Sequence, residues 1–366
     1  MRIAFYAPLK APTHAIPSGD RRVARLLMQA LSLAGHEVEL ASEFRSYEGR
    51  GDPARQAAIR EEAGGIADSL LRKWRENTPQ LWFTYHVYYK APDWLGPRIA
   101  KALGIPYVLA EATHAPKRAG GPWAIGHEAT AAALGMTARV FCLSRDDEAC
   151  LVPLVGRGRI TFLPPFLDPA PYRANGKETR DAFARQLHLP ESEPWIVVAA
   201  MMREGDKLES YRLLAKVLSR VVDLPWRLLV AGDGAARGRV EAAFDELKDR
   251  VKFLGALEEE ALVRLYGAGD LMVWPGVNEA FGMALLEAQA AGLPVVSCAL
   301  RGIPDVVADG RTGLLAASLD EAALAARVRE LLMDEGKRSA MGAEAARRVA
   351  AERSVAHAAE RLRLLP

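Results

Sequence analysis

The sequence has few cysteines, little excess charge and no long hydrophobic run. Its three cysteines, Cys142, Cys150 and Cys298, form no C-x-x-C pair, which excludes a zinc knuckle and a thioredoxin-type site. So few thiols favour a reducing compartment, and we expect a cytoplasmic protein. The 48 Lys and Arg residues nearly balance 46 Asp and Glu residues, which disfavours a nucleic-acid partner. No run approaches the roughly 18 apolar residues of a membrane span, and MRIAFYAPLKAP is typical of a first strand rather than a signal peptide.

The length of 366 residues, half of them hydrophobic, predicts two globular domains. Short apolar runs alternate with amphipathic stretches of helical spacing, a rhythm that predicts parallel sheets with right-handed crossovers. In the first half the predicted strands are Ile3–Ala7, Glu37–Ala41, Leu81–Tyr85, Tyr107–Ala110, Val140–Ser144 and Ile160–Leu163. In the second half they are Trp195–Ala200, Trp226–Ala231, Val251–Leu254, Leu271–Trp274, Pro294–Ser297 and Gly313–Ala316.

The rhythm pauses between the two halves, where prolines and charges cluster. We therefore expect an N-terminal domain over 1–168, a linker over 169–193 and a C-terminal domain over 194–349. Both domains are predicted to be α/β, doubly wound and Rossmann-like, and to face each other across a cleft. The stretch Ser339–Leu365 is rich in Ala, Arg and Glu and is predicted to be helical.

The segment WPGVNEAFGMALLEAQAAGLPVVS, residues 274–297, carries the strongest chemical signal. A strand ends here, Glu279 stands in a loop, and Phe281, Gly282 and Met283 open a helix. The free N–H groups and the dipole of a helix N-terminus favour phosphate. Glu279 and Glu287 lie eight positions apart, so one carboxylate could bind a sugar and the other a ribose. Two surface glutamates on an Ala-rich helix would give the same spacing.

The pattern E-x-FGM-x-L-x-E-A-x-A-x-G-x-P-V-V resembles the glutamate-x7-glutamate signature of family-4 retaining glycosyltransferases, which have the GT-B fold. The flanking segments MMREGDKLES, LLVAGDG, VKFLGALEEEALVRLYGAGDLMVWP and GIPDVVADGRTGLL are similar to that family in the same order. The resemblance spans nearly all of 195–320 and is looser over 1–168, the part that the family uses for acceptors. It also implies that the chain crosses back onto the first domain with a helix at about 350–366.

The resemblance implies roles for residues of the second domain. Arg203 and Lys207 would neutralise a diphosphate, although the family's glycine before the arginine is Met202 here and the spacing is one residue short. An ordinary solvated loop is the alternative. Glu279 would orient the sugar and Glu287 would hold the ribose. The nucleotide is further assigned to Phe253, beside the base, and to the backbone at Phe281, Gly282 and Met283.

In the first domain, PSGDRR places Gly19 where the family has a glycine-rich loop, with Asp20 in place of its second glycine. Capping of a helix would explain the same residues. His114 follows the fourth strand, where the family often has a histidine that faces the donor sugar, and His86 is the second candidate on the same argument. A structural histidine is the alternative for both.

The sequence holds no D-x-D motif, so we expect no metal site and no cofactor other than the nucleotide-sugar substrate. The resemblance implies a hexosyltransferase that retains anomeric configuration, with a UDP-sugar favoured as donor and a saccharide or lipid-linked acceptor. The expected setting is cell-surface glycan, lipopolysaccharide or glycolipid synthesis. The slightly basic N-terminal half favours weak association with the inner membrane face. A GDP-mannose-dependent mannosyltransferase, a sugar-nucleotide epimerase and a silent GT-B partner protein are the alternatives. The sequence specifies no oligomeric state.

Overall fold

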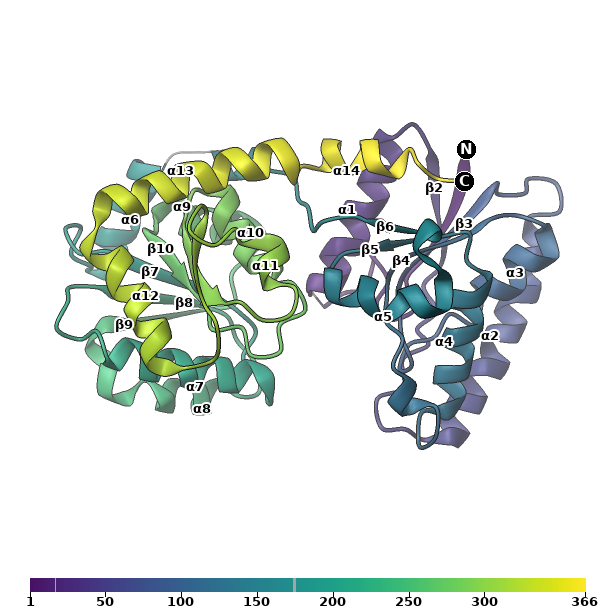
Figure 1. The fold of residues 1–366 in the computed structure, drawn as a ribbon, viewed down its shortest axis with the longest axis horizontal. Helices are drawn as coiled ribbons and strands as arrows, with labels where there is room; N and C mark the ends of the chain where they lie inside the picture. Colours follow the sequence, from purple (N-terminus) through teal and green to yellow (C-terminus); the bar gives the residue numbers. More distant parts are fainter. Residues whose placement is uncertain (17, 174–175) are drawn as a thin grey trace. The chain divides into compact units, whose positions relative to one another are not determined.

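The computed structural model describes residues 1–16, 18–173 and 176–366, which divide into two compact units (Figure 1). The first unit comprises 1–164 and 355–366, and the second comprises 165–354. Each unit contains one parallel sheet of six strands. No helix in the described ranges combines the length and the apolar character needed to cross a membrane.

The sheet of the first unit has the strand order β2-β1-β3-β4-β5-β6. Its strands are β1 (Arg2–Tyr6), β2 (Glu37–Ser42), β3 (Leu81–Val87), β4 (Tyr107–Ala112), β5 (Arg139–Cys142) and β6 (Ile160–Phe162). The helices are α1 (Gly19–Leu33), α2 (Pro53–Lys73), α3 (Gly96–Leu103), α4 (Ala124–Met136), α5 (Arg145–Val155) and α14 (Val355–Leu362). The strand order reverses between β1 and β3, so right-handed crossovers place α1 on one face and α2 to α5 on the other.

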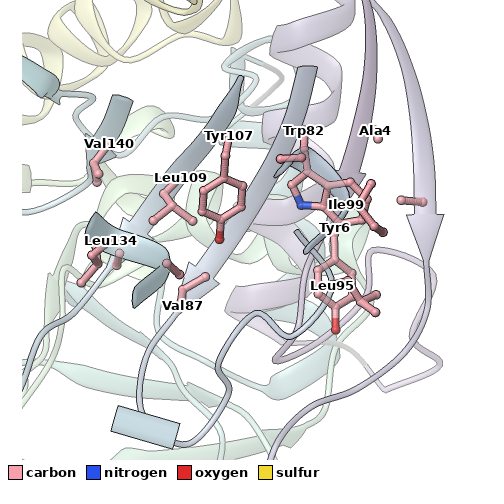
Figure 2. Packing of buried hydrophobic residues seen from close by; sticks show 14 of the residues in the cluster. Ala4, Tyr6, Trp82, Val87, Leu95, Ile99, Tyr107, Leu109, Leu134 and Val140 are labelled. Carbon is pink, nitrogen blue, oxygen red and sulfur yellow. The ribbon is translucent and has the colours of Figure 1, made fainter. Parts of the chain in front are cut away.

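The core of the first unit lies between its sheet and helices α2 to α5. Figure 2 shows Tyr6, Trp82 and Tyr107 of the strands packing with Leu95 and Ile99 near α3, all at most 2% exposed. A parallel strand that is covered on both faces is mostly apolar, and all six residues of β4 are buried, with Glu111 as its one charged residue. This is why continuous apolar runs in the sequence marked the strands.

The sheet of the second unit has the order β12-β11-β10-β7-β8-β9. Its strands are β7 (Trp195–Ala199), β8 (Arg227–Ala231), β9 (Val251–Gly255), β10 (Leu271–Val273), β11 (Val295–Cys298) and β12 (Gly313–Ala316). Its α-helices are α6 (Gly176–Leu187), α7 (Asp206–Ser219), α8 (Arg237–Ala243), α9 (Glu259–Ala268), α10 (Met283–Ala290), α11 (Ile303–Val306), α12 (Glu321–Met333) and α13 (Glu335–Glu352). Here the order reverses between β7 and β10, and α7 and α8 lie on the face opposite α9 and α10.

All twelve predicted strands exist, but three predicted features differ in detail. Within 169–193, where we expected a linker, η3 (Ala170–Arg173) and α6 pack against α9 and so form part of the second unit. The stretch Ser339–Leu365 is two helices instead of one, because α13 ends before Arg353 and α14 begins at Val355. The helix expected to open at Phe281 begins at Met283, because Gly282 has a left-handed φ of 73°.

The C-terminal helix α14 packs against α1 in the first unit. Its buried side chains, Val355, Ala358, Ala359 and Leu362, recur at helical spacing and form one stripe. Just before this helix, the carbonyl of Arg353 accepts a hydrogen bond from the N–H of Leu167 over 2.9 Å. Both of these residues belong to the second unit.

Candidate active site

The candidate site of the second unit lies at the carboxyl ends of β7 and β10. These two strands are neighbours, and the strand order reverses between them, which is where open α/β sheets bind ligands. The segment after β7 carries Arg203 and enters α7, and the segment after β10 carries Glu279 and enters α10. The two loops meet around a cavity of about 250 Å³, lined by Arg203, Glu204, Asp206, Lys207, Val277, Asn278 and Glu279.

Lys207 and Glu279, which lie 72 positions apart, form an ion pair in this cavity. Lys207 Nζ is 2.5 Å from Glu279 Oε2, and the two side chains are only 26% and 18% exposed. Trp274 holds the same carboxylate oxygen through its Nε1–H at 3.3 Å, and its ring lies 5.4 Å from Lys207 Nζ. Partial burial strengthens the attraction, since fewer water molecules screen it than on an open surface.

Arg203 is the second cation of the cavity and is exposed. Within the described part of the chain, no acceptor pairs with its guanidinium. Its five N–H donors are therefore available to a ligand, and their fork suits the oxygens of a phosphate. Lys207 and Arg203 thus place two positive charges at one cavity.

The loop between β10 and α10 is held in shape by polar contacts that the sequence did not reveal. Asn278, with a left-handed φ of 54°, donates through Nδ2 to Asp206 over 3.0 Å and accepts from Arg301 over 2.7 Å. Ser210 Oγ accepts from the amide of Val277. Asn278 stands in the segment that signalled a turn and Trp274 at the end of the predicted strand before it, but neither signal discloses tertiary partners.

The start of α10 leaves backbone donors available beside this loop. Among the described residues, no carbonyl accepts from the amides of Phe281, Gly282 or Met283. Leu285 N–H donates instead to the carbonyl of Gly282, which sets the first turn. Phe281 and Met283 bury their side chains, with 8% and 9% exposure, so only their backbone could contact a ligand.

Gly282→Ala is expected to destabilise the second unit. An added Cβ would lie 3.0 Å from Leu285, and the left-handed backbone would cost about 1–2 kcal/mol for a residue other than glycine. Gly238→Ala is the matched control, because its Cβ would contact nothing within 4 Å. Urea unfolding of both variants measures the difference, and equal midpoints would contradict the strain at Gly282.

Glu287 does not line the cavity. It is 5% exposed on α10, and the hydroxyl of Tyr266 on α9 donates to its Oε2 over 3.2 Å. Phe253 is on the outer strand β9, two strands from β7, where its ring packs edge-on against Phe244 at 6.0 Å. Their assignments to ribose and base therefore stay predictions, and neither side chain joins the Lys207–Glu279 pair.

The predicted residues of the first unit lie at the carboxyl edge of its own sheet. Gly19 opens α1, where Ser18 Oγ caps the helix and a Cβ on Gly19 would meet nothing within 4 Å. His114 follows β4, with its ring 5.0 Å from that of His127. Burial and the neighbouring His127 lower the pKa of His114, which favours a neutral ring near pH 7. Roles for Gly19 and His114 stay predictions.

No cluster of three or more His, Cys, Asp or Glu side chains suited to a metal ion occurs in the described ranges. Cys142, Cys150 and Cys298 are free thiols. Burial raises the pKa of Cys298 to about 12, and burial likewise raises the pKa of Cys142 and Cys150, so none of them is an activated thiolate.

Comparison with known proteins agrees with this fold. Residues 193–334 match the family model described as glycosyl transferases group 1. The chain as a whole has the GT-B fold: sucrose-phosphate synthase from Thermosynechococcus elongatus aligns over 99% of this chain and 97% of that one, with a TM-score of 0.77 and 21% identity. Anabaena HepE, in complex with UDP and glucose, aligns over 98% and 97%, with a TM-score of 0.73 and 15% identity.

The sequence is also similar to D-inositol 3-phosphate glycosyltransferase of Corynebacterium urealyticum, with 32% identity over 193 residues. That alignment covers 50% of this chain and 46% of the relative. The chain thus spans about half the length of the curated relatives that it matches.

Proposed function

We propose that this protein is a retaining glycosyltransferase that moves a hexosyl group from a nucleoside diphosphate sugar to a hydroxyl group of an acceptor. The observation that carries the proposal is the cavity at the β7–β10 reversal, where Arg203 and Lys207 stand beside Glu279. The match of residues 193–334 to a glycosyltransferase family model supports it. A UDP-sugar is the favoured donor, in keeping with the UDP bound by the structurally similar HepE.

In the proposed mechanism the diphosphate binds Arg203, Lys207 and the amides of residues 281–283. When the bond between the sugar and the β-phosphate breaks, negative charge grows on the phosphate and the sugar becomes oxocarbenium-like. Fixed cations and N–H groups lower the energy of that charge without reorganising, which is a major source of rate enhancement. The departing phosphate takes the proton of the acceptor hydroxyl on the same face, which retains configuration.

Glu279 has two roles in this mechanism. Its carboxylate accepts hydrogen bonds from sugar hydroxyl groups, and its pairing holds Lys207 at the cavity. The hydrogen bond from Trp274 fixes the Glu279 carboxylate. The sugar hydroxyl groups therefore bind to a carboxylate whose position is set before the sugar arrives. We further propose cell-surface glycan, lipopolysaccharide or glycolipid synthesis as the setting, with a saccharide or lipid-linked acceptor.

The function is tested by incubating the protein with UDP-, GDP- and ADP-sugars and measuring release of the nucleoside diphosphate. Slow release from one of them, accelerated by a suitable acceptor, is expected. An epimerase would instead yield a new sugar nucleotide, and a silent binding protein would release nothing. Analysis of the product's anomeric configuration by NMR tests retention, and an inverted product would contradict it.

Treatment with EDTA is expected to leave turnover nearly unchanged. The proposal assigns the charge of the leaving diphosphate to Arg203, Lys207 and backbone amides, and the sequence lacks a D-x-D motif to hold a bridging metal ion. Initial rates with and without EDTA measure the effect. A loss of activity that is restored by adding Mg²⁺ or Mn²⁺ would contradict this account of the diphosphate site.

A further inference from the structure

The first unit holds a cluster of charged side chains to which the proposed donor chemistry gives no role. We call Asp20, His86 and Glu111 the acidic-histidine cluster. His86 Nδ1 lies 2.9 Å from Asp20 Oδ1 and 3.8 Å from Glu111 Oε1. Asp20 belongs to the first turn of α1, His86 to the end of β3 and Glu111 to the end of β4.

The cluster stands where the fold of the first unit favours ligand binding. Asp20 follows β1 and His86 ends β3, the two neighbouring strands between which the strand order reverses. His86 and Glu111 occupy facing positions between the paired residues Tyr85–Ala110 and Val87–Ala112. Both have left-handed backbones, with φ of 62° and 55°. Such backbone strain is concentrated at functional sites.

One buried atom of the cluster, Oε2 of Glu111, has no hydrogen-bond donor in the described part of the chain. Glu111 is 7% exposed and has the Tyr85 hydroxyl beside its carboxyl group, but its Oε2 atom forms no hydrogen bond with any described residue. A buried carboxylate oxygen without a donor is unfavourable, and the usual remedy is a donor from the protein, water or a ligand. His86 and Asp20, with side chains 20% and 35% exposed, leave the cluster accessible from solvent.

The charges of the cluster restrict which ligand suits it. Burial by itself would lower the pKa of His86, but Glu111, Asp20 and Asp147 outweigh it and raise the pKa to about 9, so the ring is cationic near pH 7. Burial raises the pKa of Glu111, and the His86 charge opposes that rise. Burial would raise the pKa of Asp20 as well, but its hydrogen bond to His86 prevails and lowers it.

A hydroxyl group fits these charges better than an anion. It can donate to Glu111 Oε2 if that carboxyl is ionised and accept from it if it is protonated, and neighbouring hydroxyls suit the two oxygens of a carboxylate. A phosphate or carboxylate group would meet the carboxylates of Asp20, Glu111 and Asp147, which outnumber the nearby cations His86 and Lys10, so like charges would repel it.

We propose that the acidic-histidine cluster binds neighbouring hydroxyl groups of an uncharged polyol or sugar, which serves as the acceptor. The role of this ligand as acceptor rests on the proposed function, whereas the binding of its hydroxyl groups does not. The relatives' name refers to an inositol phosphate, so an uncharged acceptor would set this chain apart from them.

Binding is tested with the 366-residue chain in the presence of UDP, by calorimetry and saturation-transfer NMR. The probes are methyl α-glucoside and myo-inositol, compared with glucose 6-phosphate and inositol 3-phosphate. We expect the uncharged probes to bind in the millimolar range. Glu111→Gln, which removes the charge at nearly constant volume, is expected to weaken that binding about 10- to 100-fold.

Asp20→Asn is the second variant, since Asp20 is more exposed than Glu111 and its replacement threatens folding less. Glu62→Gln on the exposed side of α2 is the matched control and should bind like the wild type. Thermal unfolding verifies that each variant is folded. Binding unchanged in both Glu111→Gln and Asp20→Asn would overturn the inference, as would preference for the phosphorylated probes or no binding of either uncharged probe.

The outcomes separate this inference from the proposed function. Uncharged probes that bind through the cluster without any sugar transfer would support the hydroxyl site and count against the transferase. Sugar transfer that proceeds with unchanged acceptor KM in Glu111→Gln and Asp20→Asn would support the transferase and overturn the cluster's role.

Discussion

Replacing Glu279 or Lys207 by alanine is expected to lower turnover by a factor of about 10²–10³, the usual effect of removing a group that stabilises developing charge. Lys207→Ala removes a cation from the diphosphate, and Glu279→Ala removes the carboxylate that orients the sugar and holds Lys207. Because both act in one ion pair, the double variant should lose less than the product of the two single losses. Steady-state turnover under saturating donor measures all three.

Two surface residues of the same helix provide matched controls. Lys216 pairs with Glu321 and Glu209 pairs with Arg212, and in both cases the replaced side chain is more than half exposed. Lys216→Ala and Glu209→Ala should therefore retain full turnover. Melting temperatures should fall by no more than about 2–4 °C in any of these variants, the shift for about 1 kcal/mol in a domain of this size. Near-full turnover in Glu279→Ala or Lys207→Ala would contradict the site assignment.

Removing residues 355–366 is expected to destabilise the first unit far more than the second. The burial of Val355 and Leu362 alone contributes about 3–6 kcal/mol, a large share of the 5–15 kcal/mol by which domains are stable. Truncation after Ser354 keeps the Leu167–Arg353 contact of the second unit. Hydrogen exchange followed by mass spectrometry should show faster exchange across α1 and the first sheet. Faster exchange confined to 165–354 would contradict the packing of α14 on α1.

A pair of leucines in the C-terminal segment gives a milder form of the same test. Leu362 is fully buried, whereas Leu364 is 56% exposed. Leu362→Ala should cost the first unit about 2–5 kcal/mol, and Leu364→Ala should change its stability by at most about 0.5 kcal/mol. Denaturant unfolding compares the two, and equal costs would show that Leu362 adds little to the core.

The sequence alone predicted the strands because buried parallel strands are apolar on both faces. Residues 195–198 and 271–273 are fully buried, and each run is apolar without interruption. The predicted edges were less accurate, as at Trp274, which lies one residue beyond β10 and donates through its indole N–H to Glu279. The start of α10 was predicted at Phe281, two residues before its actual start at Met283. Periodicity cannot detect the left-handed backbone of Gly282 that delays the helix.

Several of the residues that line the candidate site were also predicted from the sequence. Arg203, Lys207 and Glu279 follow predicted strands, at the carboxyl edge where open α/β sheets bind ligands. The ion pair between Lys207 and Glu279 was not predicted. That Lys207 pairs with Glu279 depends on β7 lying next to β10, although β8 and β9 intervene in the chain. Pairing of strands that are distant in sequence is set by the packing of the whole sheet.

The acidic-histidine cluster shows the same division. His86 was a candidate from its position after a strand, whereas Glu111, which directly follows the predicted strand Tyr107–Ala110, was not singled out. Only the tertiary structure brings Asp20, His86 and Glu111 together. The strand order places the ends of β1, β3 and β4 next to one another, and His86 and Glu111 both have left-handed backbones there. Local patterns thus determined the elements and their chemistry, while long-range packing decided which charges meet.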